Sequence, residues 1–242
     1  MSKQIHLTTT METANTNPIV LETTSLPAFM QYLLTHHAPP STLIVCSTKS
    51  AFLAALHEQS TAATSNQDDT STIEETTTST TSPSNAFSNA LPTLRLLSTS
   101  STLKLAFCPD TTHLRAYLSS LPNKHQQPSS NTFPQTPRLR TATPLLAILN
   151  PIALHRPTSA FSAQGLNRTF ATAVDAAAAM GRKLVLCEIA GGEQDGSVWD
   201  EELSILNVTT KRLGEMSVGR TVSARRVAGR WCTFQKLEED EG

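Results

Sequence analysis

The chain has 242 residues, of which 38% are apolar, and a formal net charge of −1 at pH 7. This length allows one large domain or two small ones, and the near-zero charge gives no overall indication of a polyanionic partner. No apolar run approaches the roughly 20 residues that a membrane-spanning helix needs, so we expect a soluble, intracellular protein.

Three segments have compositions that cannot contribute to a core. Residues 1–17, 58–90 and 122–143 are rich in Ser, Thr, Asn, Gln or Pro and poor in large apolar side chains. Such segments bury too little apolar surface to offset the entropy of ordering, so we expect a disordered tail and two disordered insertions. The remainder is predicted to be a single domain over residues 18–237, of roughly 160 to 170 ordered residues, followed by an acidic tail at 238–242.

Strands and helices alternate through most of this domain. Residues 42–46 form an apolar, partly β-branched run that predicts a strand, and residues 50–57 have helical spacing. Residues 103–108 and 111–121 repeat the same order of strand and helix.

The middle of the chain continues the pattern. Residues 145–149 predict a third strand, and residues 162–180 predict the longest helix, which Gly181 terminates. Residues 183–189 predict a fourth strand. Strands that are apolar throughout and alternate with helices indicate an α/β fold with a mostly parallel sheet covered by helices on both faces.

The last part of the domain has a different pattern. Residues 204–212 and 221–228 alternate like exposed or edge strands, and a turn at residues 229–230 leads into an apolar run that contains Trp231 and Phe234. We therefore predict that the domain ends in antiparallel strands, with both aromatic side chains in the core.

The order of these segments from residue 145 onward resembles the C-terminal half of the RecA-like recombinase core, as found in the eukaryotic recombinase paralogues. Residues 145–150 occupy the place of the Walker B strand, and residues 164–168 begin the long helix. Trp199 corresponds to a Trp-containing loop, Lys211 and Arg212 to a strand, and Arg225 and Arg226 to a basic hairpin. The resemblance covers about 90 residues and implies a RecA-like domain.

The departures from the family concern ATP binding. The chain contains no GxxxxGK[ST] motif, and residues 47–50, after the first predicted strand, supply Lys49 and hydroxyls but no glycine. Asn150 stands at the degenerate Walker B position, where a neutral amide holds Mg²⁺ poorly. Glu188 ends the next strand, and we expect it to cap a structural network. The sequence therefore predicts a protein without catalytic activity, cofactor or metal.

The most informative chemical feature is a basic segment between residues 211 and 236. It holds seven basic residues against the single acid Glu215: Lys211, Arg212, Arg220, Arg225, Arg226, Arg230 and Lys236. Guanidinium groups suit phosphodiester backbones, so Lys211 and the arginines up to Arg230 are candidate nucleic-acid-binding residues. The alternatives are an interface with a partner subunit and pairing with the acidic tail.

Cysteines and histidines give no metal-ligand spacing. Cys46, Cys108, Cys187 and Cys232 are far apart and are predicted to be buried free thiols. The histidines are scattered and are expected at the surface or at helix ends.

These features favour a non-catalytic subunit of a recombinase-paralogue or Shu-type complex. Such a protein would pair with another RecA-like subunit, contact single-stranded DNA and support homologous recombination and DNA repair in the nucleus. An alternative with the same fold is a non-catalytic RecA-like subunit of an Elongator-type complex for tRNA modification, for which a cytoplasmic location is expected. An ATPase with an unrecognised site ranks last.

Overall fold

The protein is described here by a computed structural model, which defines residues 16–65, 94–125, 143–189, 197–205 and 220–237. The six strands of its main sheet are β1 (Ile19–Glu22), β2 (His37–Val45), β3 (Leu103–Phe107), β4 (Thr143–Leu149), β5 (Lys183–Glu188) and β8 (Thr233–Lys236). They lie in the order β3-β2-β4-β5-β1-β8, and every neighbouring pair is parallel.

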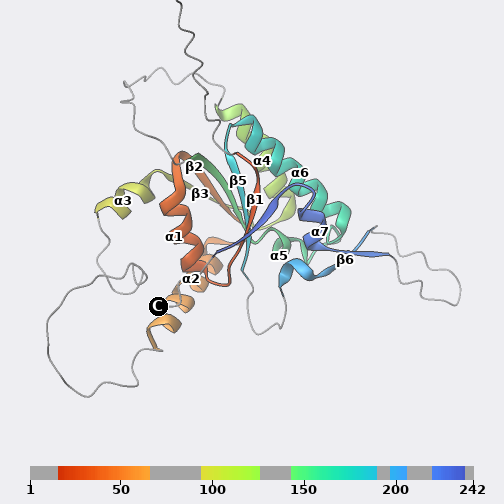
Figure 1. Ribbon diagram of the computed structural model, residues 1–242, viewed down its shortest axis with the longest axis horizontal. Coiled ribbons are helices and arrows are strands. Elements are labelled where there is room, and N and C mark those ends of the chain that lie inside the picture. Colours follow the sequence, from red (N-terminus) through yellow and green to blue (C-terminus); the bar gives the residue numbers. More distant parts are fainter. Residues whose placement is uncertain (1–15, 66–93, 126–142, 190–196, 206–219, 238–242) are drawn as a thin grey trace, which may run out of the picture.

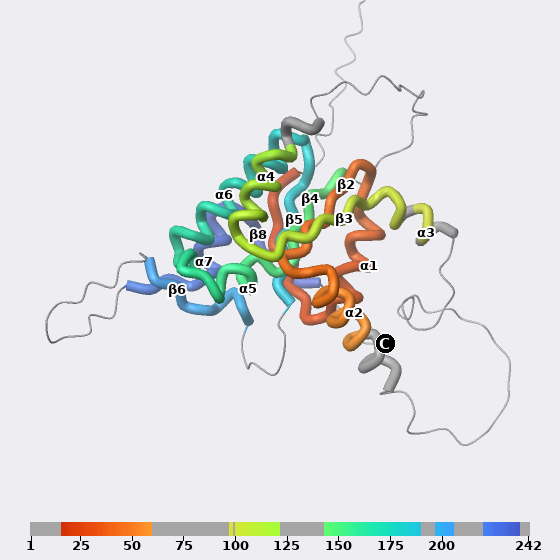
Figure 2. Tube along the Cα trace, turned by 180° about the vertical axis from the view of Figure 1, so that it is seen from behind, coloured from red at the N-terminus to blue at the C-terminus, as the bar shows by residue number. Residues whose placement is uncertain are grey.

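Helices cover both faces of this sheet (Figure 1). Helices α1 (Leu26–His36) and α2 (Lys49–Ser65) cover one face, and α4 (Thr111–His125), α6 (Ala163–Ala179) and α7 (Ala224–Ala228) cover the other. Helix α3 (Leu94–Ser101) precedes β3, and α5 (Pro151–His155) follows β4. The view from behind in Figure 2 shows α4 and α6 side by side across the second face.

The strands are apolar on both faces because each face is buried. In β4, Leu145 and Ala147 pack toward α1, whereas Leu146 and Ile148 pack toward α4 and α6. All four side chains are at most 3% exposed. Burial on both faces is the usual reason why parallel strands lack a polar alternation, and it makes this sheet the centre of two core layers.

A separate two-stranded antiparallel sheet follows β5. It pairs β6 (Glu202–Ser204) with β7 (Thr221–Ser223), and the short 3-10 helix η2 (Val198–Asp200) precedes β6. The predicted fold class is thereby confirmed: a mixed α/β domain with a parallel sheet flanked by helices and antiparallel strands near its end, an arrangement consistent with a RecA-like fold.

Several boundaries differ from the sequence-based expectation. The first strand is β1, which the sequence analysis missed, and α2 continues to Ser65, past the expected start of the first insertion at Glu58. Helix α4 likewise continues to His125, past the expected start of the second insertion at Pro122, and β4 begins at Thr143, the last residue of that insertion. Residues 66–90 and 126–142 of the insertions, the tail before residue 16, the acidic tail and residues 206–212 of a predicted strand lie outside the described residues.

The C-terminal strands need two corrections. Residues 224–228, predicted as part of an edge strand, form helix α7, because Ser223 caps it and Ala224, Val227 and Ala228 bury one helical face. Strand β8 is not antiparallel to its neighbour: Thr233 pairs in parallel with Ile19 of β1.

Candidate functional site

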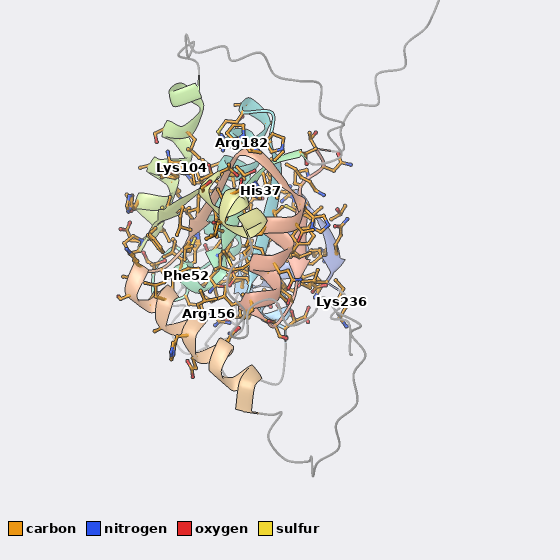
Figure 3. All side chains as sticks on the ribbon, turned by 90° about the vertical axis from the view of Figure 1, so that its left-hand side faces the viewer. His37, Phe52, Lys104, Arg156, Arg182 and Lys236 are labelled. Atoms are coloured by element: carbon orange, nitrogen blue, oxygen red, sulfur yellow. The ribbon has the colours of Figure 1, made fainter. Side chains whose placement is uncertain are left out.

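The carboxyl ends of the parallel strands meet at one edge of the sheet, where α/β proteins commonly bind ligands. Strands β1, β4 and β5 end there at Glu22, Leu149 and Glu188. Figure 3 shows Arg156 and Lys236 near this edge, with His37 and Arg182 near the opposite one.

Asn150, the predicted degenerate Walker B residue, holds two strand ends together. Its backbone is left-handed, with φ 59° and ψ 44°, a conformation that asparagine tolerates better than most residues. Its side-chain Oδ1 accepts a hydrogen bond from the Ile189 N–H at 2.8 Å, and its own N–H donates to the Cys187 carbonyl at 2.8 Å. The amide oxygen that would face a ligand is therefore used to tie β4 to the end of β5.

Glu188 was predicted to cap a structural network, and the structure places its side chain at the start of helix α5. Its carboxylate accepts hydrogen bonds from the Ile152 N–H and, at 3.4 Å, from the Ala153 N–H, both in the first turn of α5. Burial raises the pKa of this carboxyl to about 8, although the two backbone hydrogen bonds favour the charged form. Both oxygens face the chain's own backbone, so Glu188 serves the fold.

The turn between β1 and α1 contains only Thr23, Thr24 and Ser25, whereas the phosphate-binding P-loop motif spans about eight residues. Its backbone N–H groups are also occupied. The Ser25 N–H donates to Thr23 Oγ1 (3.2 Å), the Leu26 N–H to Gln59 Oε1 (2.7 Å) and the Ala28 N–H to Ser25 Oγ (3.2 Å).

Position 27 is proline, which has no N–H, and the Phe29 N–H donates to the Ser25 carbonyl at 3.1 Å. An anion site at a helix start depends on free N–H groups. The start of α1 offers none from Ser25 to Phe29, because the chain itself satisfies each donor.

The turn at residues 47–50 lies between β2 and α2 and not after the first strand of the fold. Thr48 Oγ1 accepts a hydrogen bond from the Ala51 N–H at 3.2 Å, and the Lys49 and Ser50 side chains are exposed. The Thr48 hydroxyl thus acts as an ordinary helix cap.

The candidate nucleic-acid-binding residues separate into three groups. Lys211 and Arg212 lie outside the described residues. Arg220, Arg226 and Arg230 are exposed, and within the described part of the chain their side chains form no ion pair. The basic hairpin that the family resemblance implied is instead the helix α7 with a turn after it, so Arg226 and Arg230 project from a helix and a turn.

Arg225 differs from its neighbours because its guanidinium is engaged. Its Nη2 donates to Glu22 Oε1 at 2.6 Å, and its Nε donates to Asp200 Oδ1 at 2.9 Å. One face of the group lies over the Phe234 ring, 4.5 Å from the ring centre. The hydrogen bonds to Glu22 and Asp200 raise the pKa of Arg225. Sequence reasoning missed both acids because they lie on β1 and η2, far from the basic segment along the chain.

Trp231 and Phe234 were predicted in the core; both are half-buried and pack against it. The indole N–H of Trp231 donates to Asn167 Oδ1 on α6 at 2.9 Å, which fixes the ring against that helix. This contact gives Trp231 a structural role.

A buried polar cluster between α4, α5 and α6 was also missed. His155 is fully buried, its Nε2 lies 2.9 Å from Thr169 Oγ1, and burial and the charge of Arg115 lower its pKa to about 4. Arg115 donates to Thr169 Oγ1 and to the Gly165 carbonyl, both at 3.0 Å. The expectation that histidines lie at the surface or at helix ends is therefore incomplete: His155 does end α5, but there it is a buried neutral imidazole.

All four cysteines are buried free thiols, as predicted. Burial raises the pKa of each thiol, to about 11 for Cys108 and about 12 for Cys232, which disfavours the reactive thiolate. Among the described residues, no cluster of His, Cys, Asp and Glu side chains is arranged to hold a metal ion. In the same residues, no helix is both long and apolar enough to cross a bilayer.

Fold and site together define an α/β domain with an all-parallel main sheet, consistent with a RecA-like fold. At its carboxyl edge, Asn150 and Glu188 form hydrogen bonds with the chain's own backbone. No protein-family model matches the chain, and no curated protein matches it either.

Proposed function

We propose that this protein is a non-catalytic subunit of a recombinase-paralogue complex, which supports homologous recombination and DNA repair in the nucleus. In this proposal it pairs with another RecA-like subunit and contacts the backbone of single-stranded DNA, without turnover of a nucleotide.

The exposed arginines carry the proposal. Arg226 and Arg230 project from α7 and the turn after it, and Arg220 precedes β7 in the same part of the fold. Exposed guanidinium groups that follow one another within a short stretch of the chain suit a phosphate backbone. The hydrogen bonds at the carboxyl edge support the non-catalytic part, because the N–H groups from Ser25 to Phe29 and the Glu188 carboxyl group are engaged within the chain.

A charge-reversal experiment tests the DNA contact. The double variant Arg226→Glu/Arg230→Glu should weaken binding of the full chain to a labelled oligothymidine by about tenfold or more at low salt. Loss of two phosphate contacts should also make the slope of log K against log[salt] less steep by about 1.4. Fluorescence anisotropy at several salt concentrations measures both quantities.

The matched control is Lys49→Glu/Lys104→Glu, which reverses two exposed charges on α2 and β3. It makes the same change in net charge away from α7, so binding should change by less than about twofold. Equal weakening by both double variants, or no weakening by either, would contradict a DNA contact at Arg226 and Arg230.

Co-purification from the source cells tests the partner. Recombination proteins, including a second RecA-like subunit, are the expected result. Recovery of Elongator subunits instead would replace the proposal with the alternative role in tRNA modification, because the fold suits both assemblies.

A further inference from the structure

We infer that Glu22 and Asp200 mask Arg225, so that the free chain holds one arginine of its basic segment away from nucleic acid until the two carboxylates release it. This inference rests on the proposed function and adds a regulatory contact to the same site.

The geometry of Arg225 supports masking. Two of its three guanidinium nitrogens donate to carboxylates, at 2.6 Å to Glu22 and 2.9 Å to Asp200. The Phe234 ring covers one face of the group. A phosphate that pairs with the Nε and Nη2 side of the group would have to displace these carboxylates.

The neighbouring arginine shows the contrast. Arg226 follows directly in α7, and its exposed side chain pairs with no described acid. Consecutive residues on a helix point about 100° apart, so Arg225 faces the end of β1 while Arg226 faces solvent. Release of Arg225 would therefore add a second cation beside one that is already available.

The exposure of the three partners makes the mask reversible. The side chains of Arg225, Glu22 and Asp200 are 37%, 26% and 61% exposed. Ion pairs that water reaches are weak and exchange readily. Helix α7 does not depend on them for its position, because Ala224, Val227 and Ala228 anchor it in the core and Ser223 caps it.

A double-mutant cycle tests the mask. Glu22→Gln/Asp200→Asn should tighten binding of the full chain to oligothymidine by about threefold or more at low salt, because one further phosphate contact becomes available. Arg225→Gln in the native background should change binding by less than about twofold, since the native side chain is already occupied. Adding Arg225→Gln to Glu22→Gln/Asp200→Asn should abolish the gain.

Two controls separate masking from general charge and from misfolding. Asp175→Asn/Glu202→Gln removes two exposed carboxylates from α6 and β6, and it should tighten binding less than Glu22→Gln/Asp200→Asn does. Asp200→Asn alone breaks one bond to Arg225 at the most exposed partner, and it should give part of the gain even if the double variant folds poorly.

Several outcomes would overturn the mask. A strong loss of DNA binding for Arg225→Gln in the native background would show that Arg225 contacts DNA directly. If Asp175→Asn/Glu202→Gln tightened binding as much as Glu22→Gln/Asp200→Asn does, the gain would follow from net charge alone. If Glu22→Gln/Asp200→Asn binds as the native chain does while Arg226→Glu/Arg230→Glu binds weakly, only the mask fails. If no variant binds DNA, the DNA contact and the mask fail together.

Discussion

Replacing Gly165 by alanine tests how α6 packs against the turn that precedes it. A Cβ atom at this position would lie 1.9 Å from the carbonyl oxygen of Ala160 and 2.9 Å from its carbonyl carbon. Ordinary contact begins near 3.4 Å, so the turn would have to move by about 1.5 Å, the difference between 3.4 and 1.9 Å. The Thr158 hydroxyl holds the turn by donating to the His155 carbonyl at 2.8 Å.

The two energetic effects of Gly165→Ala have opposite signs. Alanine stabilises the helix by at most about 1 kcal/mol relative to glycine at this first-turn position, whereas overpacking a held turn costs about 1–3 kcal/mol. Since the overlap is with backbone, which cannot rotate away, we take the upper part of that range and expect a net loss of about 1–2 kcal/mol. For a domain of this size the melting temperature should fall by roughly 2–8 °C.

Thermal unfolding followed by circular dichroism measures this effect. The control is Gln164→Ala, an exposed position one residue earlier in the same helical turn, which should change stability by less than about 0.5 kcal/mol. A higher melting temperature for Gly165→Ala would show that helix propensity dominates and that the close approach of Ala160 is not a constraint.

Three further predictions concern stability and are measured by urea unfolding. Asn150→Ala should destabilise the protein by about 1–2 kcal/mol more than Asn150→Gly, because only the alanine is strained at φ 59° and both lose the bond to Ile189. Ser162→Ala should cost about 1 kcal/mol, since the buried hydroxyl caps the Gly165 N–H at 3.1 Å, and no loss would contradict that role. Because burial raises the pKa of Glu188 from 4.5 to about 8, the folded state keeps a proton that the unfolded chain releases, so its contribution to stability falls as pH rises from about 4.5 to about 8. Between pH 6.5 and 8 this loss is about 1.5 kcal/mol in the native chain, and it should be absent in Glu188→Gln. Over the same range His155, whose unfolded-state imidazole titrates near pH 6.5, changes stability in the opposite direction by less than about 0.5 kcal/mol.

The parts of the fold that the sequence predicted are those with a local pattern. Strands β4 and β5 were predicted because runs such as residues 145–149 are apolar on both faces. Helix α6 was predicted because its apolar residues recur at helical spacing and are followed by Gly181, which has φ +62° and ends the helix. Strand β1 was missed because it is four residues long and directly follows a polar tail. Its place between β5 and β8 depends on the pairing of Ile19 with Val185 and Thr233, which no local pattern encodes.

The sequence of the basic segment contains a signal for helix α7 that was overlooked, but none for the ion pairs of Arg225. Ser223 before Ala224, Val227 and Ala228 is a helix cap followed by apolar residues at helical spacing, and it could have predicted α7. The engagement of Arg225 had no such signal, because Glu22 and Asp200 approach it only through the packing of β1, η2 and α7. Charge counted along the chain overestimates the charge that a ligand meets.

The carboxyl edge and the exposed arginines should therefore respond differently to substitution. At the edge, four side chains accept hydrogen bonds from the chain's own N–H groups. Asn150 accepts one at the end of β5, Glu188 one at the start of α5, and Ser25 and Gln59 one each at the start of α1. Removing any one leaves a donor unsatisfied and lowers stability. The side chains of Arg226 and Arg230 form no ion pair with a described residue. Their replacement should therefore leave the unfolding free energy nearly unchanged while the affinity for DNA falls. Edge variants that lost binding at full stability would instead reveal a ligand at the carboxyl edge.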